Sequence, residues 1–199
     1  MRKTIIFGED YGHEVVAKTL LLRMAEAEDI SIETSVRSCR GGYGRMMNEL
    51  REFAEELKTG RHQLPDLLLV ATDADCKGIT ARTQEVMSCV PEELHCFTSC
   101  MIPDPHVERW LLLDSRAFKS VLGCGCQAPD AKCERHRYKK LLREAVTNAG
   151  VTPQLGGLEY AEDLVRTMDM DKVAQLDTSF RKSVSGIRSF LMKWSMEER

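Results

Sequence analysis

A continuous apolar run at residues 67–71, Leu-Leu-Leu-Val-Ala, constrains the fold of this chain more than any other feature. Five apolar residues in succession, without alternation, are typical of a parallel strand that is covered on both faces. The run begins after Pro65-Asp66 and ends at Thr72-Asp73, so residues that favour turns bound it on each side. A strand of this kind needs helices on both faces of its sheet, which predicts an α/β protein.

The rest of the N-terminal half has the alternating pattern that such a fold requires. Short apolar or alternating segments predict strands, and segments with apolar residues at helical spacing predict helices between them. We expect strands at residues 3–8, 30–36, 67–71 and 94–102. We expect helices at residues 13–28, 46–58 and 79–88. Residues 1–104 are therefore predicted to form a mainly parallel four-stranded sheet flanked by helices.

After this core the pattern becomes helical. Apolar residues at helical spacing predict helices at residues 105–120, 136–149, 159–168 and 179–194. No segment before them has the composition of a linker. Residues 105–199 are therefore expected to form a helical extension packed on the core, within one compact domain.

Net charge, hydropathy and cysteine usage restrict the setting. The formal net charge is -3, so any binding of nucleic acid has to come from local basic patches. No apolar run approaches the roughly 20 residues that span a bilayer, and Gly8-Glu9-Asp10 interrupt the apolar start. We expect a cytoplasmic protein with no membrane partner, whose 8 cysteines are reduced thiols.

Acidic residues follow two of the predicted strands. Glu9 follows the first strand, and Asp73 and Asp75 follow the strand at residues 67–71. In an open α/β sheet, ligands collect at the carboxyl ends of the strands. Several carboxylates at one place suit Mg²⁺ or Mn²⁺. The alternative is that the Asp-Ala-Asp segment only starts the next turn and helix, because Asp is common at helix N-termini.

These acids and two later segments resemble the Toprim family of primases, topoisomerases and OLD-type nucleases. Glu9 after a first strand, with Asp73-Ala-Asp75 after a later buried strand, is the family's arrangement. The segment at residues 102–114, Ile-Pro-Asp-Pro-His-Val-Glu-Arg-Trp-Leu-Leu-Leu-Asp, is similar to one in small stand-alone OLD-type Toprim proteins. Ser179-Phe180-Arg181 matches a late helix of the same proteins. The resemblance covers most of the chain and implies a Toprim-like fold.

The resemblance also implies roles for individual residues. Glu9, Asp73 and Asp75 would be catalytic and would bind the metal. Glu14 and Glu108 would be further metal ligands. OLD-type members usually have glycine where this chain has Asp10, and their second glutamate lies four positions after the first, whereas Glu14 lies five positions after Glu9. Glu108 has an alternative role as a first-turn acid that the helix dipole favours.

Three cysteines and a histidine lie close together after residue 122. Cys124, Cys126, Cys133 and His136 supply three thiolates and an imidazole, which is compatible with a structural zinc site. The paired Cys-x-x-Cys spacing of strong zinc motifs is missing. The alternative is that these are incidental cysteines in a loop.

Basic residues near the predicted strand ends are candidates for nucleic-acid binding. Arg40 and Arg45 lie in the glycine-rich segment after the second strand, Lys77 follows the acidic pair, and Arg181 begins the last helix. Such residues would hold a phosphate backbone near the metal. The alternative is that they are ordinary solvated side chains.

Together, the resemblance implies a Mg²⁺- or Mn²⁺-dependent nuclease acting on DNA or RNA. It also implies a setting in phage defence with a partner ATPase. One alternative is a non-catalytic Toprim-like subunit that binds nucleic acid or a protein partner. Another is hydrolysis of nucleotides or small phosphate esters at the same metal site.

Overall fold

The computed structural model describes residues 1–39, 41–134 and 136–197. Its strands are β1 (Arg2–Gly8), β2 (Ile32–Ser38), β3 (Leu67–Ala71) and β4 (Thr98–Met101). Its longer helices are α1 (Tyr11–Ala27), α2 (Tyr43–Lys58), α3 (Ile79–Met87), α6 (Arg137–Asn148) and α9 (Thr178–Glu197). Its short helical elements are η1 (Glu92–Phe97), α4 (Val107–Leu111), α5 (Ser115–Leu122), η2 (Leu158–Tyr160), α7 (Ala161–Thr167) and α8 (Met170–Leu176).

The four strands form one sheet in the order β2-β1-β3-β4, and every neighbouring pair is parallel. All five residues of β3 are buried, as expected for a strand covered on both faces. The prediction of an α/β fold with a parallel four-stranded sheet is therefore confirmed. The chain turns in opposite directions after β1 and after β2, so β1 and β3 flank the point at which the strand order reverses.

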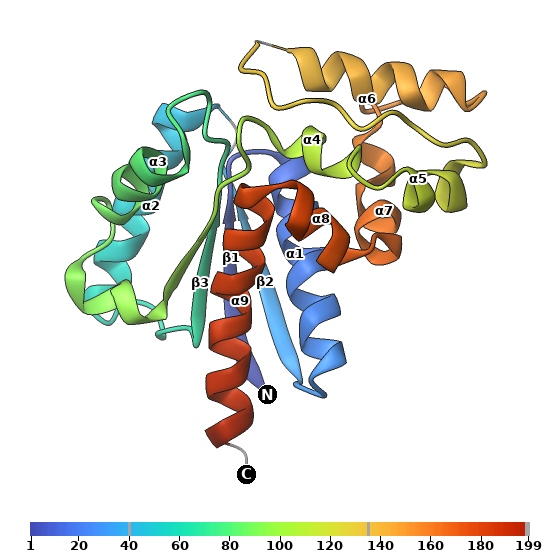
Figure 1. Ribbon diagram of the computed structural model, residues 1–199. Coiled ribbons are helices and arrows are strands. Elements are labelled where there is room, and N and C mark those ends of the chain that lie inside the picture. The colour runs from blue at the N-terminus through green and yellow to red at the C-terminus, as the bar shows by residue number, and fades with distance from the viewer. Residues whose placement is uncertain (40, 135, 198–199) are drawn as a thin grey trace.

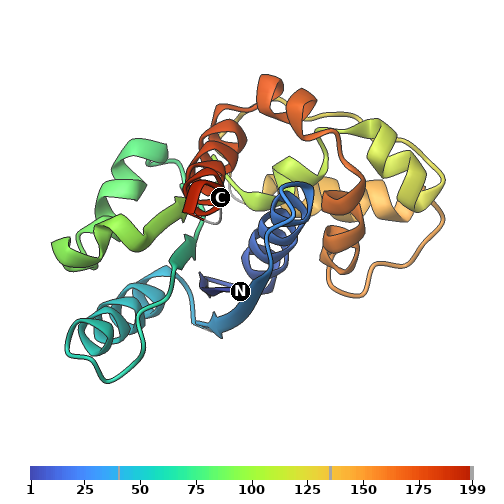
Figure 2. The same cartoon turned by 90° about the horizontal axis from the view of Figure 1, so that it is seen from below.

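Two hydrophobic cores lie on opposite faces of the sheet. On one face α2 and α3 pack against β1 and β3 around Phe7, Leu50 and Val70. On the other face α1 and the helices from α4 to α9 pack around Leu20, Leu69 and their neighbours. Figure 1 shows α2 and α3 on one side of the strands and α1 and α9 on the other. The view from below in Figure 2 shows the same arrangement. The helices after residue 104 therefore lie on the α1 face.

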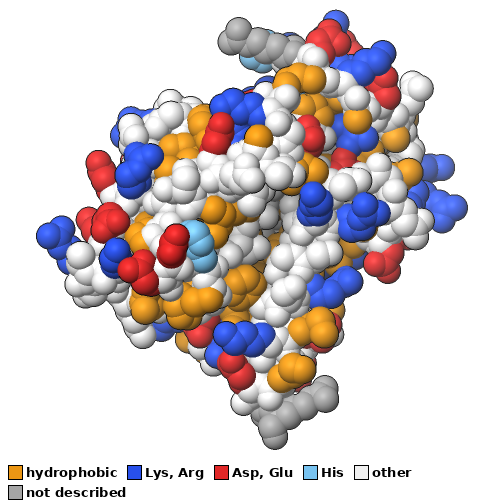
Figure 3. All heavy atoms as spheres, turned by 60° about the vertical axis from the view of Figure 1, so that its left-hand side comes forward, with side chains coloured by type: hydrophobic (Ala, Val, Ile, Leu, Met, Phe, Trp, Pro, Cys, Tyr) orange, Lys and Arg blue, Asp and Glu red, His pale blue; other side chains and the backbone are white. Residues whose placement is uncertain are grey.

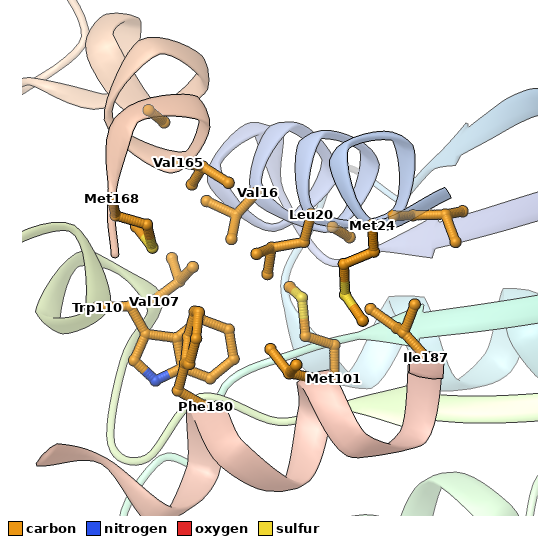
Figure 4. Close-up of a cluster of buried hydrophobic side chains, with 14 of the residues drawn as sticks. Val16, Leu20, Met24, Met101, Val107, Trp110, Val165, Met168, Phe180 and Ile187 are labelled. Carbon is orange, nitrogen blue, oxygen red and sulfur yellow. The ribbon is translucent and has the colours of Figure 1, made fainter. Parts of the chain in front are cut away.

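The core on the α1 face joins distant parts of the chain. Side chains of α1, β4, α4, α7 and α9 point toward one another in Figure 4, where Met101 of β4 lies between Leu20 and Ile187. The rings of Trp110 and Phe180 meet edge to face, with their centroids 5.1 Å apart. Aromatic pairs with this geometry add roughly 0.5–1.5 kcal/mol to the effect of burial alone. This packing holds α4 and α9 near the carboxyl ends of the strands.

Two expected elements are different in the structure. The strand expected at residues 94–102 is the helical turn η1 followed by the short strand β4, and Leu94 contributes its side chain to the α2 face from η1. The helix expected at residues 105–120 is divided into α4 and α5. Asp114 causes the division, because its carboxylate accepts a hydrogen bond from the backbone N–H of Arg116 and begins a new helix.

The helix α8 was not expected, and Asp169 begins it by accepting a hydrogen bond from Lys172 N. Among the residues that the structure describes, no helix is both long enough and apolar enough to cross a membrane.

Candidate metal centre

The candidate site lies at the carboxyl ends of β1 and β3, where the strand order reverses. Ligands bind at this position in open α/β sheets, because the loops diverge there. Glu9 directly follows β1, and its backbone N–H donates to the carbonyl oxygen of Ala71 at 3.1 Å. The hydroxyl of Thr72 donates to the Glu9 carboxylate. The structure therefore places Glu9 beside the segment that carries Asp73 and Asp75.

Asp73 is a buried carboxylate with protein donors at both oxygens. Its side chain is 10% exposed. Oδ1 lies 2.9 Å from Nε2 of His13 and 2.8 Å from the backbone N of Val107. Oδ2 lies 2.8 Å from Nδ1 of His106. Burial alone would raise the pKa of Asp73, but the charge of His13 and the hydrogen bond from His106 lower it. Asp73 is therefore ionised and fixed in orientation.

His13 connects Asp73 to Asp10, which begins α1. The Asp10 carboxylate accepts from His13 N at 3.1 Å and lies 2.8 Å from His13 Nδ1. Burial opposes the charged form of His13, but the negative charge of Asp73 and the hydrogen bonds to both aspartates raise its pKa well above the usual value. Burial likewise opposes ionisation of Asp10, but the hydrogen bond from His13 lowers its pKa. A buried imidazolium therefore lies between two carboxylates.

His106 approaches Asp73 from the segment before α4. The hydrogen bond to Asp73 raises the pKa of His106, against the effect of its partial burial. Its ring centroid lies 6.0 Å from that of Tyr138. Nδ1 of His106 also lies 3.8 Å from Oδ1 of Asp75. His106 is therefore the side chain that connects the buried carboxylate to the exposed one.

Asp75 forms the open side of the site. Its side chain is 45% exposed, and Oδ2 accepts from Nη2 of Arg82 at 3.0 Å. Asp73, Asp75 and His106 each offer a ligand atom, and these atoms lie within 4.8 Å of one another. Two carboxylate oxygens and an imidazole nitrogen suit a first-row divalent ion. In the described parts of the chain this is the one group of three or more such side chains so close together.

Glu108 lies next to this group, and one of its oxygens has no partner. The residue is 1% exposed, and Oε2 is a buried oxygen without a hydrogen bond. Oε1 lies 3.8 Å from Nζ of Lys139. Burial raises the pKa of Glu108, and the charge of Asp73 raises it further. An unpaired buried carboxylate oxygen beside three possible ligands is what a cation or its bound water would satisfy.

Glu9 and Glu14 lie outside the group of three ligands. Glu9 is bound to Thr72, as described above. Glu14 lies over the end of β1, and a Cβ atom at Gly8 would come within 2.5 Å of its Cγ. The charge of Glu14 acts on Cys39, whose pKa rises to about 12, mainly through burial and through its hydrogen bond to Glu49. Glu14 is therefore turned toward the segment after β2.

The expected zinc ligands are not brought together, and the expectation that all the cysteines are reduced thiols is wrong for two of them. Cys133 forms a disulfide with Cys76, which excludes it as a thiolate ligand. The thiol of Cys126 is half-buried beside the carbonyl oxygen of Leu112, and burial raises its pKa to about 11. Cys124 and His136 are exposed. The spacing of the cysteines carried no information about this pairing, because Cys76 is 57 residues from Cys133.

The basic candidates are spread over the surface. Arg40 lies outside the described residues. Arg45 donates to Glu49 at 2.6 Å, and Lys77 donates to Glu85 at 2.8 Å. Arg181 is exposed and lies 3.4 Å from the hydroxyl of Thr178. On the face seen in Figure 3 basic and acidic side chains are interspersed, so this face has no uniform basic surface.

Sequence reasoning missed three residues of the site, Asp10, His13 and His106. One signal was present for the first two, because Asp10 stands three positions before His13 at the start of an apolar helix, where a carboxylate caps the helix. His106 stood inside the segment that resembles Toprim proteins, but nothing in the pattern distinguished it. Contacts between β3 and α4 decide its role, and a single sequence does not reveal them.

Comparison of the chain with models of protein families gave no match. Comparisons with curated proteins and with solved structures gave no significant match either.

Proposed function

We propose that the protein is a divalent-metal-dependent nuclease with a Toprim-like site, which hydrolyses phosphodiester bonds in DNA or RNA. The observation that carries the proposal is the approach of ligand atoms from Asp73, Asp75 and His106 at the point where the strand order reverses. The unpaired oxygen of Glu108 beside them supports a cation at this place. Mg²⁺ or Mn²⁺ is the ion that the carboxylates favour.

In this proposal Asp73, Asp75 and His106 would hold the ion, with the imidazole of His106 in its neutral form. A bound divalent ion lowers the pKa of water and stabilises negative charge on phosphoryl and leaving oxygens. His13 fixes Asp73 from behind, because it donates to Oδ1 and is itself held by Asp10. Glu9, which follows the neighbouring strand β1, would be the carboxylate that accepts a proton from the attacking water. The arrangement of Asp10, His13 and Asp73 is the part that preorganises the site.

A nuclease assay with matched variants tests the proposal. The purified protein is incubated with plasmid, single-stranded DNA or tRNA in the presence of Mg²⁺ or Mn²⁺, and Asp75→Asn is expected to lose cleavage. Asp75 is the suitable target because it is exposed and because its buried partner Arg82 keeps an ion pair with Glu85 after the replacement. Glu52→Gln, on the exposed surface of α2, is the control and is expected to keep full activity. Failure to cleave any polymer, alone or with a partner ATPase, would contradict the proposal.

One observation favours a second candidate, a non-catalytic subunit that binds nucleic acid or a protein partner. Both oxygens of Asp73 are already engaged by His13, His106 and the Val107 backbone. A carboxylate satisfied in this way can hold the loops together without binding a metal. Calorimetric titration with Mn²⁺ separates the two candidates. The nuclease requires Mn²⁺ binding that Asp75→Asn weakens, whereas the non-catalytic subunit requires no Mn²⁺ binding.

A further inference from the structure

The disulfide between Cys76 and Cys133 lies directly beside the candidate metal centre. Cys76 follows Asp75 in the chain, and Cys133 belongs to residues 123–134, which contain no helix or strand. The two Cα atoms are 5.5 Å apart, a normal spacing for a disulfide. Both residues are exposed and line one surface cavity of about 380 Å³ together with Lys132. Oxidants and reductants can therefore reach the bond.

The turn that the disulfide holds has an unfavourable backbone. Asp75 and Cys76 have φ angles of 45° and 68°, in the left-handed region that residues other than glycine rarely adopt. Such conformations are energetically unfavourable and persist only where the surroundings hold them. Noncovalent contacts also hold this turn, because Lys77 N donates to Ala74 O at 3.0 Å and Arg82 binds the Asp75 carboxylate. The N–H of Asp75 lies 3.4 Å from the Pro105 oxygen. The disulfide adds a covalent restraint to these contacts, directly after Asp75.

The far end of the link stays anchored whether or not the bond is formed. Tyr138 is fully buried, and its hydroxyl accepts from Lys132 N at 2.8 Å and lies 2.8 Å from the carbonyl oxygen of Asp130. The segment before Cys133 is therefore held against α6 without the disulfide. Cys76 and Cys133 also lie outside both hydrophobic cores. Breaking the bond is expected to release the Asp75 turn and leave the fold intact.

We propose that Cys76 and Cys133 form a reversible oxidation site that controls the position of Asp75 and, through it, metal binding. Its effect on metal rests on the proposed function. In the forward step hydrogen peroxide takes the hydrogens of both thiols, its O–O bond breaks, the S–S bond forms, and two water molecules leave. A dithiol reductant reverses the step by two thiol–disulfide exchanges and is itself oxidised to its cyclic disulfide. Exposed disulfides are the kind that undergo such exchange.

The test compares oxidised and reduced protein by peptide mapping, hydrogen exchange and Mn²⁺ titration. The oxidised protein is expected to give a linked peptide that contains Cys76 and Cys133, and dithiothreitol is expected to remove it. Reduction is expected to speed amide exchange at residues 74–78. It is also expected to weaken Mn²⁺ binding about fivefold or more, the lower range of coupling between sites.

Two serine variants complete the design. Cys133→Ser is expected to bind Mn²⁺ like the reduced wild type and to show no response to peroxide. Cys96→Ser, which replaces an exposed unpaired cysteine, is the control and is expected to keep the full response. Equal Mn²⁺ affinity in both redox states, or failure of the linked peptide to form, overturns the inference. Slower exchange on oxidation without any Mn²⁺ binding would support the oxidation site and contradict the proposed function and the control of metal binding.

Discussion

Two aspartates, Asp73 and Asp177, are almost completely buried, at 7% and 4% exposure, but they are bound by different kinds of donor. Asp73 is bound by His13 and His106, whose charge depends on pH and whose nitrogens can also bind metals. Asp177 is bound by Arg109, which stays charged at any pH that a protein meets, and by Phe180 N at 2.7 Å. A buried carboxylate is therefore not by itself evidence of a functional site.

The residues around the two aspartates also differ in how completely their polar atoms are bonded. Ser179 donates to Asp177, and the oxygen of the same hydroxyl accepts from Nε1 of Trp110 and from Asp104 N, both at 3.0 Å. These bonds join α4 to the start of α9. Around Asp73, by contrast, Asp75 is exposed and Glu108 has an unpaired oxygen. The comparison teaches that the Asp177 group joins helices through a permanent charge, while the Asp73 group has titratable donors and an exposed carboxylate beside it.

Asp177→Asn is expected to cause the largest loss of stability. Arg109 cannot release its charge, so the substitution leaves a buried guanidinium without a counter-ion, which costs about 3–5 kcal/mol. Unfolding in urea, followed by circular dichroism, measures the loss. Glu52→Gln is the control, and it is expected to stay within about 0.5 kcal/mol of the wild type. A loss for Asp177→Asn as small as that of the control would show that the pair with Arg109 is not structural.

Asp73→Asn is expected to cost less, about 1.5–3 kcal/mol, the range for a buried hydrogen bond to a charged group. His13 keeps Asp10 as a counter-ion and can also release its proton, and the asparagine oxygen still accepts from Val107 N. The same urea titration compares this variant with Asp177→Asn. Equal losses in the two variants would remove the distinction between titratable and permanent partners.

Bound Mn²⁺ is expected to stabilise the wild type by about 2.7 kcal/mol when its free concentration is a hundred times Kd. Asp177→Asn should keep this gain, because its substitution lies outside the group of metal ligands. Asp75→Asn should lose most of it. Unfolding with and without Mn²⁺ measures both differences. If Mn²⁺ raised the free energy of unfolding equally in Asp75→Asn and in the wild type, Asp75 would be excluded as a ligand.

Much of the sheet could be predicted from the sequence, because local pattern determines it. The bounds of β3 agree with the predicted strand, since an apolar run between turn-forming residues has few alternatives. The prediction of a strand from Leu94 to Phe97 was wrong, because apolar residues in a short helical turn can fill a core as strand residues do. The division between α4 and α5 depends partly on the distant residue Asp169, whose N–H binds the Asp114 carboxylate at 2.9 Å.

The candidate site was predictable only in part. The positions of Glu9, Asp73 and Asp75 after strands indicated one edge of the sheet, because parallel strands end together. In the sequence His13 looks like an ordinary polar residue at the start of a helix. Its contact with Asp73 joins residues 60 positions apart. His106 reaches Asp73 because α4 packs over the strand ends. Such contacts depend on how the elements pack, which one sequence does not specify.

The smallest expected effect concerns pH in the absence of metal. The raised pKa of His13 gives stability that is present below about pH 6.5 and is lost as pH rises through its folded pKa. The lowered pKa of Asp73 gives stability that is present above about pH 4 and is lost as pH falls through its folded pKa. The Asp73 group therefore stabilises the fold most between these values.

The variant His13→Gln separates the pH-dependent contribution of His13 to stability from that of the rest of the fold. With a chelator present, the difference in unfolding free energy between the wild type and this variant is expected to fall from about pH 6 to about pH 9. The corresponding difference for Asp177→Asn should stay constant over the same range, because arginine does not titrate there. If both differences changed equally, pH would be acting on the whole fold, and the contrast between the two buried aspartates would not hold.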